Sequence, residues 1–484
     1  MPAAHCCCLT AIVPRQAVRV KRMGQTVPYF DIGGRPAIPM YGTLYPPPLR
    51  PQVPVSVIAV TGFSIYLRLT AQNTMTTAEI ARTSKYDPFS IAVMRDPLPY
   101  YKELRDHFPV HHMPQYNAWA FSRFEDVLSI FENDAHFHSA EGTLSNKEGL
   151  SKFEKGAGPK WQKDPTPLLG FNETETYGKL RQAMMAELKP KSVTALADDI
   201  RKRTNALLDK LIPQKRFNVT LDFAGIVAAG SVCGMAGVPV EDAAEVLAAA
   251  NLATKQDPVT GGFPPDWIKN RDTLLEICRK AVRRQIAGQS DRPLPVIEKL
   301  RELEVEGRKL TVNDIAILIS SILLGGSETL PKVFAHGLLE LNRNPSQKAE
   351  VMSDLENNAR PAFEEMLRYC GPAQWFMRTV LTPVTIAGHK LEVGERVVAL
   401  IQSGNRDERE YPNPDQFQWN RPNTRHLGFG NGLHFCIGSH LARLEGKILL
   451  QEFLRRVPEY TIEEAVRTPS SFQWGYSSMA LSIA

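Results

Sequence analysis

A single cysteine, Cys436, lies in a glycine-rich stretch that directly precedes a predicted helix. Four glycines surround it: Gly428, Gly430, Gly432 and Gly438. Where a loop enters a helix, free backbone N–H groups and the positive helix end stabilise a thiolate. Such a thiolate suits a soft metal with one axial position to fill, and haem iron is the leading candidate. Zinc is a poorer alternative, because it takes four ligands and only His434 lies close by.

The residues around this cysteine form an ordered pattern of aromatic, glycine, histidine and thiol positions. They are Phe429, Gly430, Gly432, His434, Cys436 and Gly438. The pattern resembles the haem-binding signature of the cytochrome P-450 family. The resemblance implies that Cys436 is the axial ligand of the iron in haem b (iron protoporphyrin IX). It also implies a mainly α fold with small β-sheets, an α-rich triangular domain with a long, kinked central helix over the haem. The alternative is an inert buried cysteine beside a turn.

A second group of chemically able residues lies in the apolar segment 311–345. Residues 315–324 are almost wholly apolar, which predicts a helix buried on all sides. Into this helix the chain places Gly325, Gly326, Ser327, Glu328, Thr329 and Pro331. Pro331 should kink the helix, because it lacks an N–H and clashes with the carbonyl one turn earlier. Several broken helix rules within one turn indicate a functional site.

The polar turn in this helix resembles the oxygen-binding turn of the same family. By position, the resemblance makes Glu328 the catalytic acid and Thr329 the catalytic alcohol. Reductive splitting of O₂ needs two protons, which a hydroxyl and a water-linked carboxylate can deliver. Leu330 stands where a second hydroxyl is common, and we interpret it as a change in the pocket lining. The alternative for Glu328 and Thr329 is a solvent-facing helix bend.

The resemblance assigns four further residues to the haem propionates. Arg181 and Arg378 match two propionate-binding arginines, and His434 is expected as another polar contact. Tyr177 stands where relatives have a histidine, although a phenol can still donate a hydrogen bond. Cations at these positions would offset the unfavourable burial of the propionates. The alternative for both arginines is a solvated surface charge.

A structural ion pair is expected between these motifs. Glu365 and Arg368 are spaced i,i+3 on one predicted helix face and can pair. Such a pair is common by chance, so its weight comes from its place between the polar helix turn and the cysteine loop. It matches the family's Glu-x-x-Arg pair, and by resemblance Arg421 completes a network on the thiolate side.

A mostly helical scaffold must position these residues. Apolar periodicity predicts helices at 102–105, 124–133, 192–211, 223–235, 243–252 and 270–288. Short strands are expected at 118–121, 384–386 and 396–401, the last two in one small sheet, and a hairpin at 470–483. Thr311 and Asp314 predict the N-terminal cap of the long helix. Residues 139–172 form a long polar loop, which in the family roofs the substrate pocket.

Residues 1–74 differ in composition from the rest of the chain. They hold ten prolines, and seven Lys or Arg against one acidic residue. The prolines break any periodicity, and the most apolar run, 55–67, is shorter than the about 20 residues that span a bilayer. We expect this leader to be disordered, or to precede the true start at Met75. Residues 75–484 are then one domain.

The composition is that of an ordinary globular protein, with 43% hydrophobic and 23% charged residues. A net charge of +5 gives no nucleic-acid signature, and we expect no nucleic-acid or membrane partner. Seven scattered cysteines indicate a reducing compartment rather than a disulfide framework. We therefore expect a soluble, cytoplasmic monomer of bacterial type.

Together these features predict a haem–thiolate monooxygenase that inserts one oxygen atom from O₂ into a C–H bond. The substrate is expected to be a hydrophobic small molecule of terpenoid, steroid, aromatic or fatty-acyl type. The pocket candidates are Leu324, Trp375, Phe376, Met377, Phe472 and Trp474. For each of them, ordinary core packing is at least as good an interpretation.

Electrons should come from a separate ferredoxin and an NAD(P)H-dependent ferredoxin reductase, because no flavin or iron–sulfur motif follows the haem loop. Lys189, Lys191, Arg443 and Lys447 could attract an acidic ferredoxin, or be ordinary solvated charges. Two other functions stay open. A peroxide-driven peroxygenase is one, although the acid–alcohol pair argues against it. A non-catalytic haem-binding sensor or carrier, which would not need that pair, is the other.

Overall fold

The computed structural model describes residues 84–151, 177–257, 259, 262–305, 307–422, 425–467 and 470–483. The chain divides into two units, Met1–Thr74 and Met75–Ala484. The first unit, Met75 and positions 152–172 of the predicted polar loop lie outside the described residues. The expectations for the leader, the true start and the pocket roof therefore stay predictions, and every element below belongs to the second unit.

One long helix, α13 (Val312–Arg343), organises the helical part of this unit. It begins with the predicted capping box, in which Thr311 Oγ1 accepts from the Asp314 N–H and Asp314 Oδ2 accepts from the Thr311 N–H. The helix continues through Pro331 as one element of 32 residues, so the proline does not divide it. A Cβ added at Gly326 would collide with Val232 of α9 (Gly225–Ala236), which lets these two helices approach closely.

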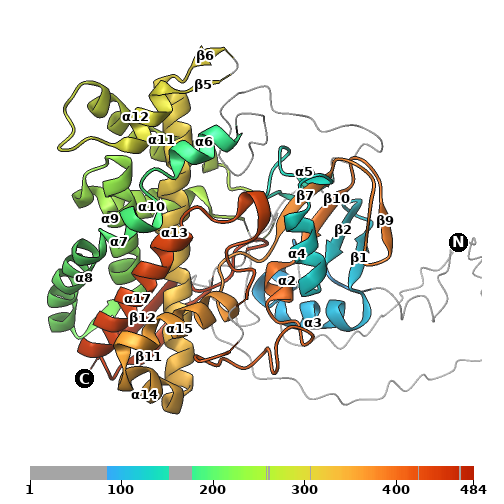
Figure 1. Ribbon diagram of the computed structural model, residues 1–484. Helices are drawn as coiled ribbons and strands as arrows, with labels where there is room; N and C mark the ends of the chain where they lie inside the picture. The colour runs from blue at the N-terminus through green and yellow to red at the C-terminus, as the bar shows by residue number, and fades with distance from the viewer. Residues whose placement is uncertain are drawn as a thin grey trace, which may run out of the picture. The chain divides into compact units, whose positions relative to one another are not determined.

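Nine other helices in the described part of the chain gather around α13, which runs among them in Figure 1. They are α6 (Tyr177–Met184), α7 (Pro190–Thr194), α8 (Ala197–Leu211), α10 (Ala243–Ala253), α11 (Trp267–Ile286), α12 (Pro295–Glu302), α14 (Pro345–Ser353), α15 (Leu355–Tyr369) and α17 (Ser439–Arg456). Their apolar faces form one core cluster. In it the rings of Phe223, Phe334 and Phe453 contact one another, with centroids 5.6, 5.9 and 6.0 Å apart. Burying these faces supplies most of the helical stability.

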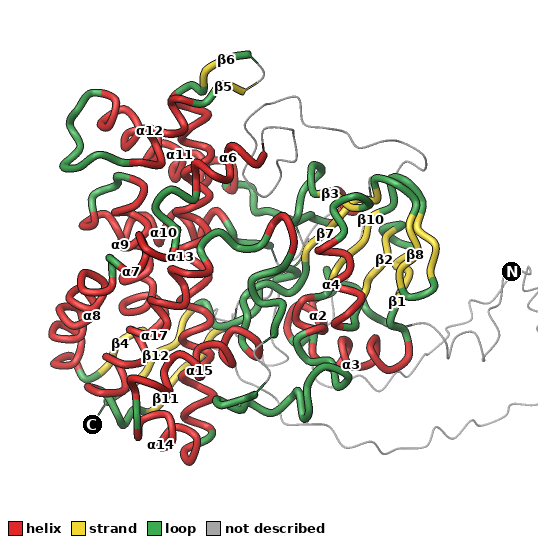
Figure 2. Tube along the Cα trace, in the orientation of Figure 1, coloured by secondary structure: helices red, strands yellow, loops and turns green. Residues whose placement is uncertain are grey.

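A five-stranded sheet lies beside the helical part, with its strands in yellow in Figure 2. The strand order is β1 (Val110–Met113), β2 (Ala118–Phe121), β10 (Arg396–Ala399), β7 (Phe376–Val380) and β3 (Phe137–His138). Strands β2 and β10 are parallel, and the other neighbours are antiparallel. Five short helices accompany this part of the chain: α2 (Ile91–Arg95), α3 (Leu98–His107), α4 (Phe124–Glu132), α5 (Lys147–Leu150) and α16 (Ile401–Gly404).

Three smaller sheets complete the described elements. The first joins β11 (Thr461–Val466), β12 (Ser478–Ser482) and β4 (Arg216–Asn218), and the others pair β5 (Glu304–Val305) with β6 (Arg308–Lys309) and β8 (Val384–Ile386) with β9 (His389–Leu391). A π-helical turn, Val219–Ala224, precedes α9, and 3₁₀ turns occur at Ile212–Gln214, Val240–Asp242 and Gly432–His434.

Two described helical stretches, Val219–Ala236 and Val312–Arg343, are long and apolar enough to cross a membrane. However, 78% of the most apolar window of the first and 67% of that of the second are buried inside the protein. Both are core helices that other elements of this unit cover.

Most predicted elements are present, but three expectations are wrong. The helix at 192–211 is divided into α7 and α8, because two aspartates in the first turn of α8 favour a new helix N-terminus there. Strands β8 and β10 do not share a sheet. The C-terminal hairpin is absent, because the backbone of residues 472–474 bonds to residues 372–374: the Gln374 N–H donates to Phe472 and the Trp474 N–H donates to Pro372.

Candidate active site

The described residues surround a cavity of ≈ 390 Å³, bordered by α13, the loop before α17 and the start of β7. Apolar side chains and glycine backbone make up most of its wall. The polar or charged residues that line it are Thr143, Tyr177, Arg181, Ser321, Thr329, Arg378, Asn431, His434, Cys436 and Glu445. Of the described cysteines, only Cys436 lines the cavity, and the others are buried elsewhere.

Cys436 lies in a closed loop just before α17. Its N–H donates to the Phe429 carbonyl over 3.0 Å, and its carbonyl accepts from the Ser439 N–H over 3.3 Å. Burial raises the pKa of the Cys436 thiol, and the Gly438 N–H and two nearby arginines oppose this rise without outweighing it. The loop alone therefore does not stabilise the thiolate, contrary to the expectation from the sequence. A bound metal cation would complete the deprotonation.

Glycines set the path of this loop at two places. Gly430 and Gly432 both have φ +67°, a conformation that other residues adopt only with strain. A Cβ added at Gly432 would also collide with the Phe131 carbonyl oxygen of α4. At Gly438 the atom nearest to an ideal Cβ is the Cys436 sulfur, 3.9 Å away. The glycines thus fix the loop against α4 and leave space beside the thiol.

Helix α13 presents the predicted alcohol, Thr329, to the same cavity. Gly325, Gly326 and Leu330 line the wall beside it, so Leu330 belongs to the lining as expected. The Thr329 hydroxyl donates to the Gly325 carbonyl over 2.6 Å. Because the donor is used in this way, the hydroxyl oxygen keeps its lone pairs available to accept a hydrogen bond.

The predicted acid, Glu328, does not line this cavity. It is 4% exposed, forms an ion pair with Lys332 one turn later, and accepts from Gln473 Nε2 over 2.7 Å. Consecutive helix residues point about 100° apart, so a Thr329 that faces the cavity turns Glu328 away from it. Glu328 and Thr329 therefore have different surroundings. This corrects the expectation that both side chains face one site as an acid–alcohol pair. The burial of Glu328 also excludes a solvent-facing bend.

Three of the residues expected at the propionates form one hydrogen-bonded group at the cavity wall. Arg181 Nη1 donates to the Tyr177 hydroxyl over 3.3 Å, and this hydroxyl lies 3.1 Å from His434 Nδ1. The other ring nitrogen, His434 Nε2, lies 3.0 Å from Ser139 Oγ. Arg181 also donates to the Phe435 carbonyl. The cation of Arg181 and the polar side chains of Tyr177 and His434 are thus brought together. Tyr177 belongs to this group, although relatives have a histidine at its position.

Arg378 lines the cavity from β7. It is buried, its Nη1 donates to the Met377 carbonyl over 2.9 Å, and its guanidinium carbon lies 5.2 Å from the centre of the Phe131 ring. Burial excludes the alternative of a solvated surface charge. A buried guanidinium in a cavity wall favours a carboxylate beside it.

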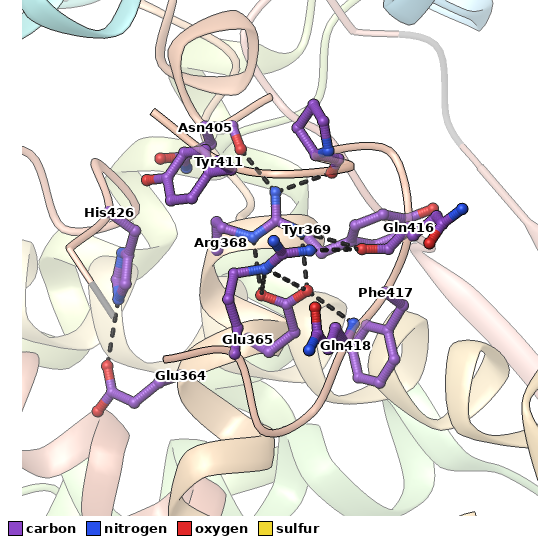
Figure 3. Close-up of polar contacts among 12 residues, drawn as sticks. Glu364, Glu365, Arg368, Tyr369, Asn405, Tyr411, Gln416, Phe417, Gln418 and His426 are labelled. Carbon is purple, nitrogen blue, oxygen red and sulfur yellow. Dashed lines mark hydrogen bonds and ion pairs between the residues drawn. The ribbon is translucent and has the colours of Figure 1, made fainter. Parts of the chain in front are cut away.

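Glu365 and Arg368 of α15 form an ion pair with two hydrogen bonds, shown in Figure 3. Arg368 Nε and Nη2 each donate to a Glu365 oxygen over 2.7 Å. Arg421 Nε lies 3.3 Å from the same carboxylate, so the three residues meet as expected. Arg368 Nη1 also donates to the carbonyls of Asn405 and Pro414, over 2.7 and 2.9 Å. These bonds tie α15 to the segment that leads into the cysteine loop.

A second ion pair on α15 was not predicted. Glu364 lies 3.1 Å from His426 Nε2 and accepts from Arg443 Nε of α17 over 2.6 Å. Burial alone would raise the pKa of Glu364, but hydrogen bonds from His426 and Arg443 and their charges outweigh it and lower the pKa to about 2. In the sequence, His426 lies 62 positions after Glu364, and Arg443 lies 79 positions after it. No local pattern in the sequence connects them.

The pocket candidates divide sharply. Phe376 lines the cavity, whereas Leu324, Trp375, Met377, Phe472 and Trp474 do not. Trp375, Met377 and Phe472 belong to a separate core cluster, and the Trp375 Nε1–H donates to the Ser471 carbonyl over 2.6 Å. Period-two alternation along β7 explains why Phe376 lines the cavity and Met377 does not. Phe376 and Arg378 lie on one face of the strand, and Met377 lies on the other face.

Glu445 of α17 lines the cavity, although it was not predicted from the sequence. It is buried, and burial raises its pKa to about 8 despite an opposing hydrogen bond with Ser231. Burial therefore favours the neutral form of its carboxyl. The available signal was its position four residues after Leu441, which places both on one helix face.

The residues present fit a haem. A thiol, two arginines and a polar group line one cavity, and the remaining wall is mostly apolar. In the part of the chain that the structure describes, no three His, Cys, Asp or Glu side chains gather as a metal site. The zinc alternative therefore has no ligand set among these residues.

Comparison with known proteins agrees with this fit. The sequence model of the family described as Cytochrome P450 matches residues 266–472. The chain belongs to the cytochrome P450 family. It is 27% identical, over 82% of this chain and 96% of the relative, to a putative cytochrome P450 123 of Mycobacterium tuberculosis. It is 26% identical, over 75% of this chain and 83% of the relative, to a methyl-branched lipid omega-hydroxylase of the same organism.

Solved cytochrome P450 structures share the fold. The cytochrome P450 CYP109Q5 from Chondromyces apiculatus matches with a TM-score of 0.68 and 26% identity, over 82% of this chain and 98% of that chain. The predicted mainly α fold with small sheets is therefore confirmed. As a cytochrome P450, the protein is a haem b monooxygenase, and it needs O₂, a hydrophobic substrate and a redox partner.

Proposed function

We propose that this cytochrome P450 hydroxylates a C–H bond of a hydrophobic small molecule of terpenoid, steroid, aromatic or fatty-acyl type. The observation that carries the proposal is that Cys436 and Thr329 line the same cavity, whose other walls are mostly apolar. The name of the mycobacterial lipid omega-hydroxylase favours branched fatty-acyl chains as the first substrates to test.

Each residue at the cavity then has a defined task. Bound haem b supplies electron transfer and oxygen chemistry at its iron. Cys436 would bind the iron as a thiolate, and Arg181 and Arg378 would neutralise the propionates. Thr329 would offer a hydrogen bond inside the cavity, and Glu328, which lies next to the cavity, would be the proton source for that side.

Tyr177 and His434 support the same propionates, and the network of Glu365, Arg368 and Arg421 holds the thiolate loop in place. Its bonds are complete and buried, which suits a structural role rather than a chemical one.

We place electron delivery with a separate ferredoxin and ferredoxin reductase driven by NAD(P)H. Lys189 and Lys191, at the start of α7, are exposed and would attract an acidic partner. Arg443 and Lys447 are paired with Glu364 and Glu356, so they contribute less. A soluble, monomeric protein in the cytoplasm, with residues 75–484 as its one domain, completes the proposal.

Product analysis under ¹⁸O₂ tests this function. The haem-loaded protein is given a ferredoxin, its reductase, NAD(P)H and methyl-branched fatty acids, then terpenoids, steroids and aromatic compounds. We expect one ¹⁸O atom in a hydroxylated product. Equal turnover with peroxide alone would favour a peroxygenase, and an absence of oxygen consumption with every compound would favour a sensor or carrier.

A further inference from the structure

Helix α13 carries a buried polar stripe that the cavity does not explain. Every fourth residue along one face has a titratable side chain: Glu328, Lys332, His336 and Glu340. They are 4%, 6%, 4% and 6% exposed. Spacing of this kind stacks side chains one above another, here over about 18 Å of helix. Four such groups in a core helix are unfavourable unless they are paired or hydrogen-bonded.

The inner end of the stripe lies next to the cavity without lining it. Glu328 is paired with Lys332 and hydrogen-bonded to Gln473, and it directly precedes Thr329, which lines the cavity. Lys332 Nζ also lies 3.3 Å from the Glu328 carbonyl oxygen. A rotation of the Glu328 side chain would connect this group to the Thr329 side of the helix.

The outer end of the stripe reaches solvent. His336 Nε2 lies 3.8 Å from Glu340 Oε1, and the same oxygen accepts from Arg343 Nη1 over 2.8 Å. The Arg343 side chain is 59% exposed. Glu340 is itself 6% exposed, and its pair with this exposed arginine places it next to bulk water.

The C-terminal segment covers the stripe from Glu328 to His336. Gln473 bonds to Glu328, and Gly475, with φ +120°, lies against Lys332. The rings of Trp474 and Tyr476 lie 6.3 and 5.1 Å from the His336 ring. This cover shields the side chains of Glu328, Lys332 and His336 from bulk solvent, and we call the contact zone between the segment and α13 the corridor.

Three buried polar atoms in this corridor have no hydrogen-bond partner among the described residues. They are His336 Nδ1, Trp474 Nε1 and Arg467 Nε, and the Arg467 guanidinium stacks on Trp474 at 3.6 Å. Leaving such atoms unbonded is unfavourable, and native proteins satisfy them with ordered water. Because no direct bond joins Lys332 to His336 in the described chain, water fits the step between them.

The charges of the stripe suit proton transfer. Burial lowers the pKa of Lys332 to about 7, so it can gain or lose a proton near neutral pH. Burial, and then the charges of Arg467, Arg406 and Arg343, hold the pKa of His336 well below its ordinary value. A neutral imidazole has one donor and one acceptor nitrogen, so it can take a proton on one side and release another on the opposite side.

We propose that this stripe is the proton-supply path of the enzyme, running from Glu340 through His336 and bridging water to Lys332 and Glu328. The proposal rests on the proposed monooxygenase function. Its balance is RH + O₂ + 2e⁻ + 2H⁺ → ROH + H₂O, with both electrons from NAD(P)H through the redox partner. The stripe supplies the two protons to the Thr329 side of the cavity.

Two ways of driving turnover test the path. Peroxide brings its own protons and electrons, since RH + H₂O₂ → ROH + H₂O, so it bypasses the stripe. In His336→Phe, which keeps the ring volume, we expect product formation driven by NAD(P)H to fall about tenfold, with more peroxide released and a larger solvent isotope effect. Peroxide-driven turnover should change less than about twofold. His336→Gln, which keeps a hydrogen bond but relays poorly, should lose NAD(P)H-driven activity similarly.

A control and an independent readout complete the test. Ser320→Ala removes another buried hydroxyl of α13, one that bonds only within its helix, and should leave both rates unchanged. A high-resolution crystal structure should place ordered water within hydrogen-bond distance of His336 Nδ1 and Trp474 Nε1. A dry corridor, or an equal loss of both rates in His336→Phe, would overturn the path. Absence of any product from the wild type would instead reject the proposed function, while the water readout stands apart from it.

Discussion

Two buried polar clusters of this cytochrome P450 differ in how completely their hydrogen bonds are made. Behind the cysteine loop, Arg368 donates to both Glu365 oxygens and to two carbonyls, and Arg421 joins the same carboxylate. Along α13, by contrast, His336 has an unpartnered nitrogen within the described chain, as do Trp474 and Arg467 beside it. A complete network holds one geometry. An incomplete one leaves donors and acceptors that protons can use.

Breaking the complete network should give the largest loss of stability. Arg368→Met removes one partner and leaves the Glu365 carboxylate buried without its main cation. We expect a loss of about 3–5 kcal/mol in the free energy of unfolding, measured by urea denaturation of the haem-loaded protein.

An exposed ion pair provides the control for this variant. Lys390 and Glu392 lie 2.8 Å apart, with side chains 71% and 37% exposed. Lys390→Ala should therefore change stability by less than about 0.5 kcal/mol. If Arg368→Met loses no more than this control, the network does not hold the fold.

The second prediction concerns pH and the neighbouring residue Glu364. Its folded pKa of about 2 lies below the ordinary value of 4.5, so its pairing stabilises the protein fully above about pH 4.5. This contribution, on the order of 3 kcal/mol, is lost as the pH falls from 4.5 towards 2. Glu364→Gln should accordingly be less stable than the wild type at pH 7, with the difference narrowing in acid. Urea midpoints at pH 7, 5 and 3 measure this, and a difference that stays constant with pH would refute it.

The smallest effect on stability is expected on α13. A buried pair replaced by residues of similar volume often costs nothing, so Glu328→Gln with Lys332→Met should stay within about 1 kcal/mol of the wild type. The matching double variant Glu365→Gln with Arg368→Met should lose clearly more, because the carbonyls of Asn405 and Pro414 lose their donor. Equal losses in the two double variants would remove the contrast between the clusters.

The sequence predicted the features that depend on local pattern. The capping box at Thr311, the course of α13 and the glycine loop around Cys436 all follow from residues close together in the chain. Glu365 and Arg368 are one helical turn apart, so their pairing was accessible too. Arg181 and Arg378 were placed only through family register, since neither has a distinctive local surrounding.

Other features could have been predicted but were not. Neighbours on a helix face different ways, which separates Glu328 from Thr329. Alternation along β7 separates Phe376 from Met377 in the same manner.

Some contacts could not be predicted from the sequence. The bonds that join Glu364 to His426, and residues 472–474 to residues 372–374, depend on tertiary packing that no short window of sequence contains.

The most direct test of the account is the coordination of the iron by Cys436. X-ray absorption at the iron edge, recorded on the purified haem-loaded protein, should show one sulfur ligand in the wild type. Cys436→Ala should show none, and should lose NAD(P)H-driven turnover. A sulfur ligand and undiminished turnover in Cys436→Ala would contradict the account.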